Sequence, residues 1–100
     1  MTWHYGLARR ARRDIDSICD WYDSQRAGLA DEFLEEFKAT CCVICARPNS
    51  FPAVLRGIRA TRCDRFPYKI YFQVTEDRID IVAVYHSARD PRRWADPERE

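Results

Sequence analysis

The fold is decided by residues 66–94, which read FPYKIYFQVTEDRIDIVAVYHSARDPRRW. Apolar and polar residues alternate from Tyr68 to Val74 and again from Ile79 to His86, which is the period of a half-buried strand. Between the two runs, residues 75–77 predict a tight turn. The stretch therefore predicts a β-hairpin that continues into a basic tail, and the rest of the chain is expected to pack on this hairpin.

The second strand of this hairpin is apolar on both sides at its centre. Residues 81–85 read IVAVY and contain no charged or amide side chain on either parity. A strand with two apolar faces is usually covered on both of them. We therefore expect this strand to lie in the interior of its sheet.

Two amphipathic helices are predicted upstream of the hairpin. Apolar residues recur at helical spacing from Ala8 to about Gln25, and again from about Leu29 to Arg47. Gly28 is a candidate left-handed cap, and Pro48 ends the second helix. Because the connection between the helices is short, we expect an antiparallel helical hairpin. The two apolar stripes consist of Ala8, Ala11, Ile15, Ile18 and Tyr22, and of Ala30, Phe33, Phe37, Cys41 and Ile44.

Two further strands complete the predicted sheet. Trp3–Tyr5 predicts a short edge strand, residues 49–55 predict a loop, and Gly57–Asp64 predicts a strand with weak alternation. On a period of two, Arg59 and Arg62 fall on opposite faces of this last strand. The element order β-α-α-β-β-β predicts an α+β fold, in which the helical hairpin packs on a small, mostly antiparallel four-stranded sheet.

The length and composition fit a single domain that spans residues 1–100. Residues 95–100 are expected to form a flexible tail, and Trp94 is expected to fold back onto the body of the domain. No apolar run approaches the ~18 residues that cross a bilayer, and the N-terminal residues lack the apolar core of a signal peptide. We therefore expect a cytoplasmic protein that makes no contact with membranes.

The five cysteines do not predict a metal site or a disulfide framework. Their number is odd, and no export signal accompanies them. Cys42 and Cys45 have the spacing of half a zinc site, but no second pair exists, and His4 and His86 lie far away in the sequence. We expect no metal and no cofactor, and we interpret the cysteines as small apolar residues of a helix.

A local basic cluster lies between residues 55 and 74. Its members are Arg56, Arg59, Arg62, Arg65 and Lys69, against Asp64 as the one acidic residue. Arginine suits bidentate contacts with phosphate or carboxylate groups, so the cluster is a candidate binding surface. Heavy use of arginine can also reflect genome base composition, and these side chains can pair with acidic residues of the helices. Both interpretations stay open at this point.

Two motifs resemble the RelE/ParE superfamily of toxins from type II toxin–antitoxin systems. One is residues 65–68 (Arg-Phe-Pro-Tyr), which lead into the apolar strand, and the other is residues 86–91 (His-Ser-Ala-Arg-Asp-Pro), which follow the last strand. The resemblance covers about residues 3–94. It implies a small bacterial toxin, in the class that includes plasmid stabilisation proteins, that inhibits growth and is neutralised by a co-encoded antitoxin.

The RelE-like branch of this superfamily cleaves mRNA in the ribosome without a metal ion. By resemblance, His86 would be the catalytic acid or base, and Arg65 would bind phosphate. Further candidates for contact with RNA or another target are Arg59, Arg62, Lys69 and Tyr71. His86 at the end of a strand can equally be a hydrogen-bonded structural residue, so whether the protein is an enzyme stays open.

The ParE-like branch inhibits DNA gyrase and is not known as a nuclease. Residues 87–91 (Ser-Ala-Arg-Asp-Pro) are more similar to this branch and to the plasmid stabilisation relatives. The resemblance thus implies a toxin that binds gyrase with the sheet face left open by the helices, together with Arg89, Arg92 and Arg93. An antitoxin would cover the same sheet. An inactive relative that acts only as a binding module is a third possibility.

Overall fold

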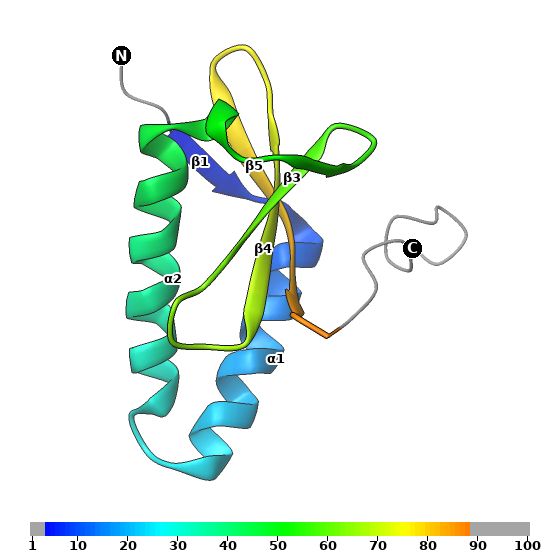
Figure 1. Cartoon of the computed structure of the whole chain (residues 1–100). Coiled ribbons are helices and arrows are strands. Elements are labelled where there is room, and N and C mark those ends of the chain that lie inside the picture. Colours follow the sequence, from blue (N-terminus) through cyan, green and yellow to red (C-terminus); the bar gives the residue numbers. More distant parts are fainter. Residues whose placement is uncertain (1–3, 89–100) are drawn as a thin grey trace, which may run out of the picture.

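The computed structural model describes residues 4–88, and residues 1–3 and 89–100 lie outside the described part of the chain (Figure 1). The elements agree with the predicted order, with one strand added. They are β1 (His4–Leu7), α1 (Arg9–Gln25), α2 (Leu29–Ala46), a short 3-10 helix (Pro48–Ser50), β2 (Ala53–Leu55), β3 (Ile58–Arg62), β4 (Tyr68–Val74) and β5 (Arg78–His86).

The strands form one sheet in the order β1-β5-β4-β3-β2. β1 pairs with β5 in parallel, and the other neighbours pair antiparallel. The predicted hairpin is β4 with β5, and β5 lies between two neighbours, as its doubly apolar sequence predicted. The predicted N-terminal edge strand is also confirmed, and it continues two residues further than expected, to Leu7, while Trp3 lies outside the described residues.

The prediction of four strands was wrong, because β2 adds a fifth. Ala53–Leu55 was predicted as part of a loop, but it pairs with β3 through Ala53–Arg59 and Leu55–Ile58. The turn between these strands is Arg56-Gly57, and both residues have positive φ angles, 49° and 81°. Two positive φ angles are typical of tight hairpin turns, where glycine is favoured. A strand of three residues is too short to produce a periodic pattern, and Gly57, which was predicted as the first residue of the next strand, lies in the turn instead.

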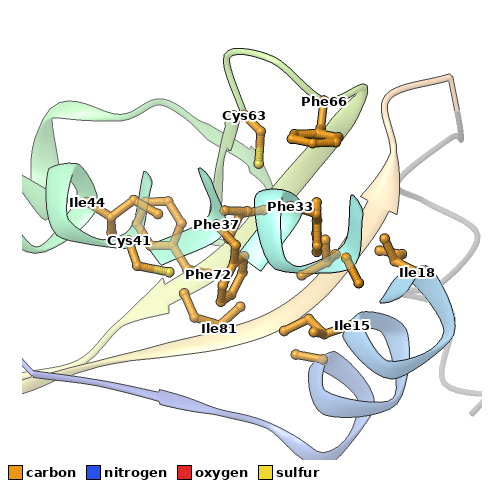
Figure 2. Packing of buried hydrophobic residues seen from close by; sticks show 14 of the residues in the cluster. Ile15, Ile18, Phe33, Phe37, Cys41, Ile44, Cys63, Phe66, Phe72 and Ile81 are labelled. Carbon is orange, nitrogen blue, oxygen red and sulfur yellow. The ribbon is translucent and has the colours of Figure 1, made fainter. Parts of the chain in front are cut away.

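The main core lies between the helical hairpin and one face of the sheet (Figure 2). Phe33 of α2 is fully buried, and its ring packs against the rings of Tyr22, Phe66 and Tyr68. Tyr22, Phe33 and Phe66 contact one another in all three pairs, with ring centroids 5.2–5.9 Å apart. Both predicted helical stripes face this core, apart from Ala8, which precedes α1. Burial of these side chains is the dominant stabilising contribution to the fold.

The opposite face of the sheet carries a second, smaller cluster. Its buried members are Tyr71, Ala83 and Tyr85, and Ile58, Ala60 and Val82 pack against them. All six residues belong to strands, so no helix residue contributes to this cluster. We call the surface formed by these six residues, together with Arg62 and Lys69, the open face.

Candidate functional site

A row of basic side chains crosses the open face. Arg62 of β3 lies opposite Lys69 of β4, and Lys69 lies opposite Tyr85 of β5. Directly opposed residues project from the same face of a sheet, so these three side chains share one face. Arg10 of α1 extends the row, because its guanidinium donates to the Tyr85 hydroxyl and its Cζ lies 5.4 Å from the Tyr85 ring centroid.

We call Arg10, Arg62 and Lys69, with Tyr85 among them, the basic row. Arg62 is exposed and Lys69 is partly exposed, so both cations can reach a partner. Beside the row, Tyr71 packs against Tyr85 with ring centroids 6.1 Å apart. The arrangement combines cations with aromatic and apolar surface, which suits an acidic protein surface or a phosphate group.

Two of the residues selected from the sequence, Arg62 and Lys69, belong to the basic row, and a third, Tyr71, lies beside it on the open face. Arg10 and Tyr85 were missed. Tyr85 was assigned to the apolar strand centre, and Arg10 lies 75 residues away in sequence, so only the docking of α1 beside β5 brings the two together.

Arg59 has a different place and different partners. Its cross-strand neighbour is Phe72, a residue of the main core, so Arg59 lies on the helix side of the sheet. Its guanidinium donates to the carbonyl oxygen of Phe51 and, at 3.4 Å, to that of Asn49. Arg59 therefore ties the segment before β2 to β3.

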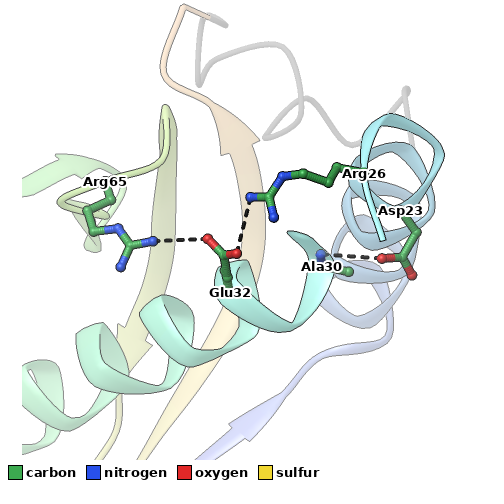
Figure 3. Close-up of polar contacts among 5 residues, drawn as sticks. All are labelled: Asp23, Arg26, Ala30, Glu32 and Arg65. Atoms are coloured by element: carbon green, nitrogen blue, oxygen red, sulfur yellow. Dashed lines mark hydrogen bonds and ion pairs between the residues drawn. The ribbon is translucent and has the colours of Figure 1, made fainter. Parts of the chain in front are cut away.

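Arg65 lies in the turn between β3 and β4, beside α2 (Figure 3). Its Nη2 is 3.4 Å from Oε1 of Glu32, and the other carboxylate oxygen of Glu32 lies 3.1 Å from Arg26. Glu32 thus joins the turn between the helices to the turn between the strands. All three side chains are well exposed, and such ion pairs contribute little to stability, on the order of 0–1 kcal/mol.

His86 lies at the end of β5 and faces the helices. It is opposite Tyr68 of β4, and the two rings pack edge to face with centroids 5.6 Å apart. Its Nδ1 accepts a hydrogen bond of 3.1 Å from the backbone N–H of Ala88. Because Tyr68 belongs to the helix side and Lys69 to the open face, His86 and the basic row project from opposite faces of the sheet.

His86, Tyr68 and Trp21 line a groove beside α1. Two adjoining hollows of about 350 and 480 Å³ share these three residues. Tyr22 lines the second hollow, and its burial, together with the neighbouring Tyr68 hydroxyl, raises the pKa of Tyr22 to about 12. Tyr22 therefore stays protonated near neutral pH and does not serve as a base there.

Arg89, Arg92 and Arg93 lie outside the described residues. Within residues 4–88, no group of histidine, cysteine, aspartate and glutamate side chains is arranged to hold a metal ion. In the same residues, neither helix is long and apolar enough to span a membrane.

The comparisons with known proteins point to one family. A family model described as the ParE toxin of the type II toxin–antitoxin system parDE matches residues 5–91. A solved structure described as the chromosomal ParDE TA system from P. aeruginosa superposes with a TM-score of 0.75 at 20% identity. The match covers 85% of this chain and 96% of that chain, and at this identity it shows the fold alone. No curated protein matches the chain.

Proposed function

The chain belongs to the ParE toxin family of type II toxin–antitoxin systems, and from this membership we propose that it inhibits growth by binding DNA gyrase through its open face. The observation that carries the proposal is the basic row on that face. A toxin that acts by binding needs an accessible surface with directional polar contacts around an apolar centre. Arg62 and Lys69 supply the polar contacts, and the partly exposed Ile58, Ala60 and Val82, which pack on the buried Tyr71, supply the apolar centre. Arg89, Arg92 and Arg93 are proposed to extend the surface.

The antitoxin is the second partner in this proposal. The family is defined by its place in a toxin–antitoxin pair, so a cognate antitoxin protein is expected to bind this chain. We propose that acidic residues of the antitoxin meet the basic row and thereby exclude gyrase, because two ligands of one surface compete. Since gyrase acts on bacterial DNA, the proposal also places the protein in the bacterial cytoplasm.

The proposal is tested by gyrase supercoiling in vitro with matched charge reversals. Arg62→Glu and Lys69→Glu should each weaken inhibition of purified gyrase at least tenfold, because like charges then face an acidic partner. The control is Lys38→Glu, which makes the same change at an exposed position of α2, away from the open face. It should inhibit as the unchanged protein does. Equal inhibition by all three variants would refute a role for the basic row.

The alternative function is that of a ribosome-dependent mRNA endonuclease. In that case His86 would transfer the proton, and Arg59, Arg62, Arg65 and Lys69 would hold the phosphate. The placement of His86 and of the basic row on opposite faces favours the binding toxin, as does the engagement of Arg59 with backbone carbonyls. The observation that supports the nuclease alternative is the groove lined by His86, because a catalytic residue needs an accessible hollow beside it.

Pulse labelling during induced expression separates these functions. A gyrase inhibitor should halt DNA synthesis first and should keep its toxicity in His86→Ala. A nuclease should halt protein synthesis first and should lose toxicity in His86→Ala and in Arg65→Ala. If neither synthesis stops, the chain is an inactive relative that acts only as a binding module.

A further inference from the structure

Charge is distributed unevenly along α1, the helix that follows β1 (Figure 1). Four of its first five residues are arginines, and its first turn contains no acidic side chain. All charged residues in the rest of α1 are aspartates, and its last turn contains no basic side chain. The positive end of the helix macrodipole therefore coincides with the four arginines, which is the reverse of the charge order that stabilises a helix.

Three of these arginines are exposed and make no contact that offsets this arrangement. Arg10 belongs to the basic row, where it contacts Tyr85. Arg9, Arg12 and Arg13 are exposed, and among the described residues their side chains form no ion pair or hydrogen bond. They lie one, three or four residues apart, and like charges three or four residues apart on a helix repel one another. We call Arg9, Arg12 and Arg13 the arginine patch, and its charges lower the stability of α1 without a compensating contact in residues 4–88.

We propose that the arginine patch binds the phosphate backbone of duplex DNA. Guanidinium groups form bidentate hydrogen bonds with phosphate, and they stay charged at every physiological pH. Neighbours on a helix surface have Cβ atoms about 5–6 Å apart, and phosphates repeat about every 3.4 Å along each DNA strand, so each arginine can meet a phosphate. Contacts with phosphate carry no sequence information, so this binding should be independent of base sequence.

The surroundings of the patch favour DNA over an acidic protein as its partner. A protein interface has an apolar centre as well as charged groups. The apolar residues that follow the patch and alternate with it, Ala11 and Ile15, are buried in the main core. The patch thus offers charge without apolar contact, and the phosphate backbone is a partner that charge alone can bind.

The arginine patch adjoins the open face but is not part of it. Arg10 lies between Arg9 and Arg12 in the chain and reaches Tyr85 on the open face, so the patch begins where the basic row ends. A partner that presents a protein surface with DNA beside it can therefore contact both surfaces at once. This consequence rests on the proposed function, because gyrase bound to its DNA is such a partner. DNA binding itself is measured without gyrase, so the failure of either idea can be recognised separately.

The patch is bounded along α1 by a carboxylate. Asp16 is exposed and lies four residues after Arg12 and three after Arg13, which places it beside both on the helix surface. Its negative charge repels a phosphate backbone that contacts the two arginines. Asp16→Asn should therefore tighten DNA binding, which a purely structural role of the arginines does not predict.

The test measures the fluorescence anisotropy of a short labelled DNA duplex of arbitrary sequence as the full-length protein is added at several salt concentrations. The triple variant Arg9→Gln, Arg12→Gln and Arg13→Gln should bind at least tenfold more weakly at low salt. The slope of the logarithm of the binding constant against the logarithm of the salt concentration should become shallower by about 2–3, because each neutralised phosphate contributes about 0.9.

The matched control removes three positive charges from exposed positions outside the patch. Lys38→Gln, Arg47→Gln and Arg56→Gln together give the same net charge as the patch variant. This control should bind DNA more tightly than the patch variant and should keep the salt dependence of the unchanged protein. Equal affinity and equal salt dependence of the two triple variants would overturn the proposal, since net charge alone would then account for binding.

Two further measurements separate DNA binding from other roles of the arginines. Because the patch opposes the helix macrodipole, the patch variant should unfold at the same urea concentration as the unchanged protein or at a higher one. A clear loss of stability would assign the arginines to the fold and overturn the proposal. Labelled polyglutamate should bind more weakly than the duplex, and equally tight binding that also depends on the patch would mean that the partner is an acidic protein. If DNA binding depends on the patch while Arg62→Glu and Lys69→Glu leave gyrase inhibition unchanged, this inference stands and the proposed role of the basic row fails.

Discussion

Arg59 and Arg62 lie three residues apart in β3 and illustrate how parity assigns roles to identical residues. Arg59 faces the helix side and donates to the carbonyl oxygens of Phe51 and Asn49. Arg62 lies opposite Lys69 on the open face and is exposed. The first side chain satisfies backbone acceptors inside the molecule, whereas the second is available to a partner. Composition alone treats these two residues as equivalent members of one basic cluster.

Replacing these two arginines by methionine should separate stability from binding. Arg59→Met should lower the free energy of unfolding by about 1–3 kcal/mol, because two backbone acceptors lose a charged donor. Arg62→Met should change it by less than about 0.5 kcal/mol, since it is a surface substitution. Urea unfolding measures both effects. Gyrase inhibition should respond in the opposite way: Arg62→Met should weaken it, whereas folded Arg59→Met should inhibit as the unchanged protein does. Loss of inhibition only in Arg59→Met would contradict these assignments.

At the scale of elements, the hairpin β4–β5 and both helices could be predicted because each is long enough to show its period. The apolar stripes, the interior position of β5 and the split between Arg59 and Arg62 follow from periods of 3.6 and two. β2 could not be predicted in this way, since its three residues pair only after β3 is in place. The contact of Arg10 with Tyr85 also depends on tertiary packing, which no local pattern encodes.

β1 pairs with only the first part of β5, so within the described residues the rest of β5 has a strand neighbour on the β4 side alone. β1 covers β5 from Arg78 to Ile81, after which the backbone N–H of Ala8 donates to the carbonyl oxygen of Ile81 and α1 begins. Further along β5, Oδ2 of Asp14 accepts a hydrogen bond of 3.0 Å from the backbone N–H of Val84. A side chain of α1 thus replaces a strand at this edge, and edges with open N–H groups invite association between chains.

Removing this carboxylate should therefore destabilise the protein and expose the edge of β5. Asp14→Ala should cost about 1–3 kcal/mol, because the Val84 N–H loses its acceptor in a partly buried position. The matched control is Asp16→Ala on the exposed side of the same helix, which should cost less than about 0.5 kcal/mol. Urea unfolding measures the cost, and sedimentation velocity measures any self-association of Asp14→Ala. Equal stability of the two variants would show that water replaces the carboxylate.

At the scale of the whole molecule, the core makes the fold sensitive to alkaline pH. Cys41 is 0% exposed and Cys63 is 1% exposed, and burial raises their pKa values from 9.0 to about 12 and about 11. The neutral thiols pack well among the apolar side chains of the core (Figure 2), whereas a thiolate there would lack hydration. The native state consequently holds these two protons more tightly than the unfolded chain does.

The free energy of unfolding should therefore fall as the pH rises above about 9, where thiols of the unfolded chain ionise and buried thiols do not. Below that pH the two neutral thiols contribute fully to the free energy of unfolding. This contribution is lost progressively towards pH 11–12, the range of the native pKa values of Cys63 and Cys41. In this window each thiol should lower the free energy of unfolding by on the order of 1 kcal/mol per pH unit.

Urea unfolding under reducing conditions, at about pH 7 and about pH 10, measures this loss of stability. Cys41→Ala should reduce the dependence on pH, while Cys42→Ala, at an exposed position one residue further along α2, should leave it unchanged. If the free energy of unfolding of the unchanged protein stays constant across this window, the two thiols ionise as readily in the core as in water. That result would contradict the close packing of α2 on the sheet.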